Sequence, residues 1–338
     1  MANRQMGGDS CRFRPQIMNI KTIAMYDIPV LFLIFKRPET TERVFERIRQ
    51  IKPSRLYIAA DAPRAGQPDE IEQCRRARAV VETVDWECEV KTRYREQNLG
   101  CRRAVTEAIS WFFEQEEYGV IFEDDCLPDL TFFPFCRELL LRYKDDDRIG
   151  MIGGNNFSYN KVKNTIRGGV NIVPDGLSYD FCSVSHIWGW ATWRRVWKNY
   201  EADFPYWAEA KKDYNKRKSL FRCLREEIYF SSFLSDTLLG ERKINTWDVQ
   251  LWFTLRIQNQ LAIYPSVNLV TNIGLISPDA THKTSSSKIK KNYIPSSPVS
   301  FPLKHPRYVL ANYRIDQFAF HRNFFSYKRL LRYFLNDY

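Results

Sequence analysis

Residues 118–125 read Tyr-Gly-Val-Ile-Phe-Glu-Asp-Asp, an apolar run that ends in three consecutive carboxylates. The apolar part, residues 118–122, predicts a buried strand. Three carboxylates at a strand end repel one another and lose hydration unless a cation lies beside them. Oxygen ligands alone suit Mg²⁺ or Mn²⁺. An isolated triplet of this kind is more often a solvated acidic turn, so its position in the fold decides between the two interpretations.

Upstream of this stretch, apolar runs alternate with helical patterns. Strands are predicted at residues 29–35, 56–60 and 89–94, and helices at residues 37–49, 69–84 and 102–114. Such alternation predicts a parallel sheet covered by helices, with ligands at the carboxyl ends of the strands. The acidic triplet follows the fourth strand and falls at that edge, which favours metal binding over a solvated turn.

Beyond residue 147 the alternation stops. A strand is expected at 149–153, a helix at 249–258, and two strands at 261–264 and 267–270, whereas residues 155–174 are polar and residues 185–197 are rich in Trp. We expect this half to extend the same sheet. The predicted organisation is a polar leader (1–27), a main domain (28–284) and a C-terminal tail (285–338).

Composition narrows the classes of protein further. The chain has 338 residues, of which 44% are hydrophobic, enough for one large α/β core. Its eight Cys form no C-x-x-C pair, so we expect reduced thiols. The longest apolar run, residues 28–35, is too short to cross a bilayer, and the N-terminal residues lack a signal-peptide pattern. The expected location is the cytoplasm.

The net charge of +11 is concentrated near the C-terminus. Residues 283–338 hold eleven Lys or Arg and only two Asp. Residues 327–335 could form a short amphipathic helix that lies on acidic headgroups at the inner face of the membrane, next to a lipid-linked molecule. A solvated helix that caps the main domain is the alternative.

The acidic stretch also resembles a known motif. Residues 120–125, with Pro128-Asp129 and Phe132-Phe133 downstream, resemble the metal-binding motif of GT-A glycosyltransferases, among them N-acetylglucosaminyltransferase I and bacterial family-2-like sugar transferases. The resemblance extends from about residue 29 to residue 282. It implies a GT-A (Rossmann-like) mixed sheet flanked by helices, in which residues 28–126 bind nucleotide and residues 127–284 face the acceptor.

The resemblance assigns roles to the carboxylates. It implies that Asp125 is the direct metal ligand and that Asp124 lies near the ribose or sugar of the donor. Glu123 would bind the donor or support the turn. An Mg²⁺ or Mn²⁺ ion would then bridge the two phosphates of the donor and neutralise the leaving nucleoside diphosphate.

Other strand ends fit the same comparison. Asp61 matches the position that accepts a hydrogen bond from uracil, and Phe35 and Arg37 match positions that line the pocket for base and phosphate. Asn98 and Arg102 open a helix whose N-terminus suits a diphosphate. The alternatives are a turn at Asp61, a helix start at Arg37, and a capped helix with its Arg in solvent.

Acceptor-side candidates follow in the second half. Asp248 stands between two Trp and resembles the catalytic base of inverting GT-A enzymes, although it could instead cap the helix that follows. The aromatic run 186–193 offers Trp188 or Trp190 as a platform for a sugar ring, and we favour Trp190 as a donor-binding residue. His282 is similar to a C-terminal His that reaches the metal or diphosphate, although a lone His is usually structural.

These observations together predict a metal-dependent, inverting glycosyltransferase. It would move a sugar from a nucleotide-diphosphate donor, a UDP-sugar by resemblance, to a hydroxyl of a glycan or lipid-linked acceptor, for instance in surface polysaccharide synthesis. A sugar-phosphate nucleotidyltransferase is one alternative, but residues 35–38 lack its Gly-rich signature. A non-enzymatic binder of nucleic acid or membrane is another, but it leaves residues 123–125 without a role; we expect no nucleic-acid partner.

Overall fold

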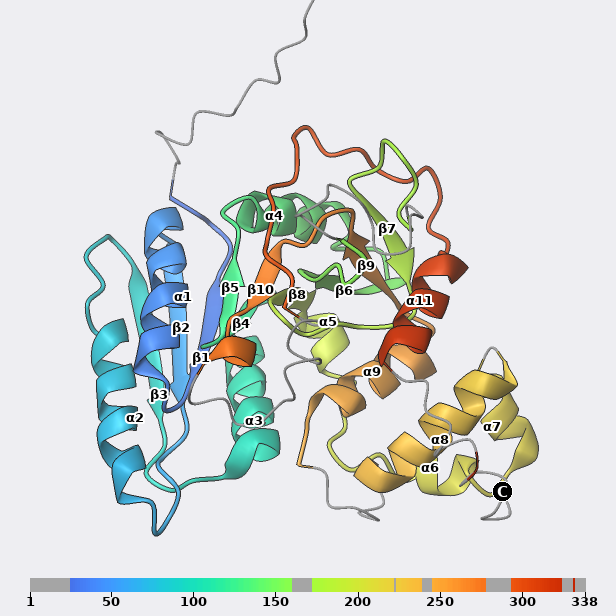
Figure 1. Ribbon diagram of the computed structural model, residues 1–338, viewed down its shortest axis with the longest axis horizontal. Helices are drawn as coiled ribbons and strands as arrows, with labels where there is room; N and C mark the ends of the chain where they lie inside the picture. Colours follow the sequence, from blue (N-terminus) through green and yellow to red (C-terminus); the bar gives the residue numbers. More distant parts are fainter. Residues whose placement is uncertain are drawn as a thin grey trace, which may run out of the picture.

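The computed structural model describes residues 25–159, 172–221, 223–238, 245–277, 293–323 and 331. They form an eight-stranded mixed sheet flanked by helices, together with a two-stranded ribbon (Figure 1). The predicted fold class, a mixed α/β sheet flanked by helices in one main domain, is confirmed. None of the helices in the described part of the chain is long and apolar enough to cross a membrane.

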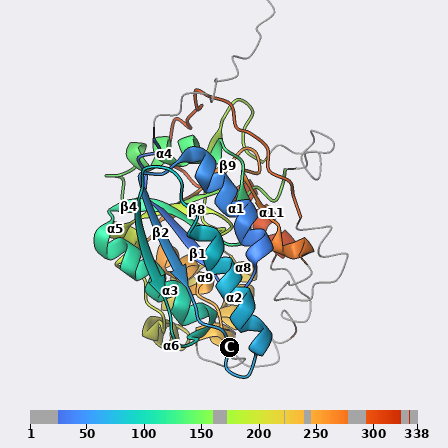
Figure 2. The same ribbon diagram turned by 90° about the vertical axis from the view of Figure 1, so that its left-hand side faces the viewer.

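The first half of the sheet is parallel. Its strands are β1 (Val30–Ile34), β2 (Arg55–Ala60), β3 (Glu89–Tyr94) and β4 (Tyr118–Glu123), in the order β3-β2-β1-β4. The connecting helices are α1 (Pro38–Ile51), α2 (Pro68–Val81) and α3 (Gly100–Gln115). Helices α1 and α2 cover one face, and α3 covers the other (Figure 2). The predicted strand–helix alternation is therefore confirmed.

The second half continues the sheet in mixed directions. Strand β8 (Trp190–Trp193) is antiparallel to β4, and β6 (Ile149–Gly153), β9 (Leu261–Pro265) and β7 (Tyr179–Cys182) follow in that order. A separate ribbon pairs β5 (Cys126–Pro128) with β10 (Val270–Asn272). The strand predicted at 267–270 begins only at residue 270, because Asn268 hydrogen-bonds across a turn to the carbonyl of Val270. The ribbon lies directly after the acidic triplet.

Further helices follow β4 along the chain, and some of them enclose a second core. They are α4 (Phe132–Arg142), α5 (Arg194–Trp197), α6 (Pro205–Ala210), α7 (Tyr214–Leu220), α8 (Leu224–Leu238), α9 (Asp248–Ile257) and α11 (Tyr313–Asn323), with a short 3₁₀ turn, η3 (Gly274–Ile276). Aromatic side chains from α6, α8 and α9 pack together, and these helices lie toward the lower right of Figure 1. This cluster forms one wall of the pocket described below.

The C-terminal segment is part of the main domain. Val299, Leu303 and Ile315 are buried in the main core, and Asp316 accepts hydrogen bonds from the backbone and hydroxyl of Ser183. Apolar side chains within this basic sequence therefore continue the packing of the main core, and the division at residue 284 stays a prediction. Apart from Leu331, the amphipathic helix predicted at 327–335 lies outside the described residues.

Candidate active site

A cleft of about 630 Å³ opens at the carboxyl ends of β1, β2 and β4, beside α3. Most of the predicted site residues line it: Phe35, Arg37, Asp61, Asn98, Glu123, Asp124 and Asp125. They come from four strand ends separated by up to about ninety residues of sequence. The parallel order of the strands brings these ends to one edge, as open sheets of this kind require.

Arg37 joins two of the three carboxylates. Its Nη1 lies 3.1 Å from Oδ1 of Asp124 and 2.5 Å from Oδ2 of Asp125. The second oxygen of Asp124 accepts a hydrogen bond of 3.1 Å from the backbone of Phe35. Burial opposes the charged form of Arg37, but the carboxylates of Asp124 and Asp125 raise its pKa above the usual value. Arg37 is thus fixed as the counter-ion of this end of the cleft.

At the end of the cleft that contains Glu123, the carboxylates outnumber the guanidinium groups. Burial, followed by the charges of Asp125 and Asp124, raises the pKa of Glu123. Its Oε1 is buried and has no hydrogen-bond partner among the residues the structure describes. Three carboxylates face one guanidinium, and an orphaned carboxylate oxygen is costly in a buried place. The donor set therefore fits a further cation.

Gly274 permits the β10 side of the cleft to approach Asp125. A Cβ at position 274 would lie 2.3 Å from Oδ2 of Asp125, so a larger residue would displace the carboxylate. The backbone N–H of Ile273 donates to the carbonyl of Asp125 over 2.8 Å. His282, predicted to reach the metal, lies further along this segment and outside the described residues.

Asp61 has a structural role that the sequence did not reveal. Its carboxylate accepts hydrogen bonds from the backbone of Leu99 at 3.0 Å and of Gly100 at 3.0 Å, where α3 begins. The Oδ1 of Asn245 accepts another from the backbone of Arg102. Three N–H groups at the N-terminus of α3, which was expected to bind diphosphate, therefore donate to side chains of the chain itself. Asp61 lines the cleft, and its carboxylate also caps the N-terminus of α3.

Replacing Asp61 with Ala is expected to lower the free energy of unfolding by about 3 kcal/mol, because backbone N–H groups of α3 lose a charged acceptor. Urea titration followed by circular dichroism measures the change. Asp61→Asn is the matched control, since it keeps one acceptor oxygen and should lose less. If Asp61→Ala unfolds like the wild type and loses only nucleotide binding, Asp61 is a ligand contact and the structural role is wrong.

Two predicted site residues lie away from the cleft. Arg102 pairs with Asp203 at 2.7 Å and donates to the carbonyl of Ala202, so its charge is directed to the outer side of α3. Trp190 is 1% exposed and stacks on Trp247 at 5.7 Å between ring centroids. It is a core residue, and Trp188, two residues earlier, lines the cleft in its place.

Asp248 lies in an adjoining pocket of about 240 Å³. It is the first residue of α9, and its side chain makes no capping bond to the helix; it accepts instead from the hydroxyl of Thr246. Trp188 lines both this pocket and the cleft, so the two are neighbours. Burial is the largest cause of the raised pKa of Glu123, followed by the charges of Asp125 and Asp124. The charge of Asp248 raises this pKa further. The residue at the N-cap of α9 is Trp247, and Asp248 follows it in the first turn of the helix.

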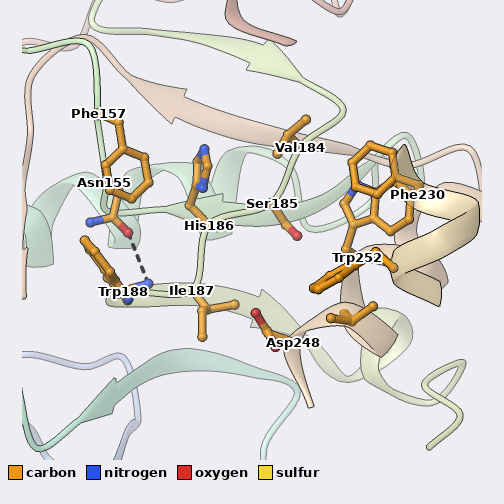
Figure 3. A pocket seen from close by; sticks show the side chains of 12 residues that line it. Asn155, Phe157, Val184, Ser185, His186, Ile187, Trp188, Phe230, Asp248 and Trp252 are labelled. Atoms are coloured by element: carbon orange, nitrogen blue, oxygen red, sulfur yellow. Dashed lines mark hydrogen bonds between the residues drawn. The ribbon is translucent and has the colours of Figure 1, made fainter. Parts of the chain in front are cut away.

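The walls of this pocket are largely aromatic. Phe157, His186 and Trp188 stand on one side, and Phe230 and Trp252 on the other, with Asp248 near the latter pair (Figure 3). Phe230 and Trp252 stack at 4.0 Å, and Phe157 meets Trp188 edge-on at 5.1 Å. The sequence signalled the Trp-rich run, but not Phe157 or Phe230, since an aromatic residue in a helix or polar loop looks like ordinary core.

Comparisons with known proteins give distant likenesses only. No protein-family model and no curated protein matches the chain. Among solved structures, mouse xyloside xylosyltransferase 1 is 11% identical with a TM-score of 0.33, and covers 83% of this chain and 100% of its own. HddC from Yersinia pseudotuberculosis is 11% identical with a TM-score of 0.31, covering 52% and 82%. The 4-diphosphocytidyl-2C-methyl-D-erythritol synthase from Anaerococcus prevotii is 12% identical with a TM-score of 0.27, covering 68% and 98%. Scores this low say nothing of the activity of this chain.

Proposed function

We propose that the chain is a glycosyltransferase that takes a sugar from a nucleotide-diphosphate donor, with UDP-sugar as the first candidate. The observation that carries the proposal is the pair of adjoining cavities, one ending at an acidic triplet and the other at a carboxylate among aromatic rings. The first suits a nucleotide diphosphate and the second suits a sugar-like acceptor, because the C–H faces of sugars pack on aromatic rings.

The donor would be held with Mg²⁺ or Mn²⁺ at Asp125. In the described part of the chain, no three His, Cys, Asp or Glu are arranged as a ready-made metal cage. Mg²⁺ commonly uses one or two carboxylates together with substrate phosphates, so Asp125 and the charge deficit at Glu123 fit such a site. When bound, the ion supplies positive charge to the leaving diphosphate. His282 stays a prediction as a second ligand.

Side chains of the protein would stabilise the leaving diphosphate, accept the proton of the acceptor and hold the acceptor in place. The guanidinium of Arg37 stabilises the negative charge that develops on the diphosphate as the bond to the sugar breaks. Asp248 accepts the proton of the acceptor hydroxyl while its oxygen forms the new bond to the anomeric carbon. Attack from the face opposite the diphosphate inverts the sugar carbon. The aromatic walls hold the acceptor, which we propose to be a glycan or a lipid-linked sugar of a surface-polysaccharide pathway.

Release of nucleoside diphosphate from a panel of sugar nucleotides tests the function. We expect turnover of one donor with Mn²⁺ or Mg²⁺ and its loss with EDTA, because the three carboxylates of residues 123–125 at one end of the cleft lie beside the guanidinium of Arg37. Release that continues in EDTA would be consistent with a glycosyltransferase but would contradict the proposed metal site. Formation of pyrophosphate from a nucleoside triphosphate and a sugar phosphate would identify a nucleotidyltransferase. Failure to bind or turn over any donor would contradict the proposal.

A further inference from the structure

A row of four residues crosses the sheet beneath α3. In the strand register, Arg93 of β3 pairs with Ala59 of β2, Ala59 with Leu33 of β1, and Leu33 with Glu123 of β4. All four line the cleft. Register neighbours in a parallel sheet point to the same face, and three strand spacings of about 4.8 Å separate the ends of the row by about 14 Å. The row has a cation at one end and the acidic triplet at the other.

The middle of the row forms a slot without charge. Ala59 and Leu33 form its floor, and Ala104 and Ala108, one turn apart on α3, form its roof with Val105. Side chains this small leave room between helix and sheet, and an apolar slot favours a flat ring over a hydrated group. A nucleoside would lie along the slot with its diphosphate toward Asp125.

Arg93 differs from every other cation of the cleft. Lys36 and Arg64 pair with Glu70, Arg95 pairs with Glu107, and Arg37 pairs with Asp124 and Asp125. Arg93 has no carboxylate partner within the described ranges; its guanidinium lies 5.9 Å from the ring of Trp111. Its N–H donors are therefore available to a ligand, at the end of the slot most distant from the site of the phosphates.

We infer that Arg93 selects the nucleobase of the donor by donating to ring carbonyl oxygens. This inference rests on the proposed function. A guanidinium offers parallel donors, which match the oxygen-bearing edge of uracil or guanine. Cytosine and adenine present an amino group at the equivalent position, and two sets of donors would face each other there. The chemistry recognised is a base with an oxo group at the position where cytosine and adenine carry an amino group, and titration distinguishes uracil from guanine.

Calorimetric titration of the full chain with UDP, GDP, CDP and ADP tests the inference. The wild type should bind UDP or GDP about tenfold more tightly than CDP and ADP, and Arg93→Met should remove that preference. Arg93→Lys should restore only part of it, since an ammonium lacks the paired donors. The charge-matched control is Arg103→Met on the exposed side of α3, which pairs with Glu107 and should leave all four affinities unchanged.

Other outcomes overturn the inference in different ways. If Arg93→Met weakens all four diphosphates equally, Arg93 contributes charge to the phosphates and does not read the base. If Arg93→Met keeps the wild-type preference, another residue makes the selection. If the wild type binds none of the four, the nucleotide site itself is absent and the proposed function fails with the inference.

Discussion

Replacing Asp125 with Ala is expected to lower kcat for release of nucleoside diphosphate by about three orders of magnitude. Asp125 is the triplet carboxylate closest to Arg37 and the one that Gly274 leaves room for. Its loss removes the proposed metal ligand and, with it, several kcal/mol of charge stabilisation at the leaving diphosphate, where each 1.4 kcal/mol corresponds to about tenfold in rate. Steady-state kinetics over a series of Mn²⁺ concentrations measures the effect.

Two further variants make the Asp125 result specific. Asp125→Asn keeps an oxygen ligand without the charge, so partial activity at high Mn²⁺ is expected. Asp203→Ala removes a carboxylate that is 92% exposed and pairs with Arg102, and it should retain wild-type kinetics. Unchanged kcat and Mn²⁺ dependence in Asp125→Ala would show that the triplet serves only to position Arg37.

Asp248→Asn is expected to reduce kcat by about 10²- to 10⁴-fold while donor binding stays intact. The carboxylate lies in the aromatic pocket next to the cleft, so it can serve as general base without contacting the nucleotide. An amide of the same shape accepts the Thr246 hydroxyl but cannot take a proton. Rates with acceptor, and calorimetric affinity for the donor, separate the two effects.

The Asp248 experiment needs a control for local structure. Thr246→Val removes the hydroxyl that donates to Asp248 and should cost far less in rate than loss of the carboxylate. Donor affinity that falls together with kcat in Asp248→Asn would mean that the residue supports the cleft. A product that retains the configuration of the donor sugar would exclude Asp248 as the base of a single displacement.

The sequence predicted the fold of residues 28–126 well because its signals are local. Each of β1, β2 and β4 is a buried apolar or nearly apolar run, and the alternation with amphipathic helices allows few arrangements. The carboxylates of 123–125 follow such a run directly, so their place at the sheet edge follows from the fold. Arg37 was placed in the right cleft for the same reason, although not beside the carboxylates.

The parts that were missed depend on long-range contacts. The row from Arg93 to Glu123 exists only in the register of four strands, and nothing near Arg93 in the sequence marks it. The capping role of Asp61 was not predicted because its partners, Leu99 and Gly100, lie almost forty residues away. Trp188 and Trp190 differ in role because β8 begins at residue 190, which makes the second a strand residue in the core. No composition argument separates such cases.

The C-terminal segment also protects an edge of the sheet. Strand β7 ends the eight-stranded order, and its Phe181 pairs with Ala311 and accepts a hydrogen bond of 2.7 Å from the backbone of Asn312. Without this cover, β7 would present free N–H and C=O groups that can pair with a strand of another molecule. The residues that look like an appendage in the sequence therefore cover part of the edge at which another molecule could add a strand.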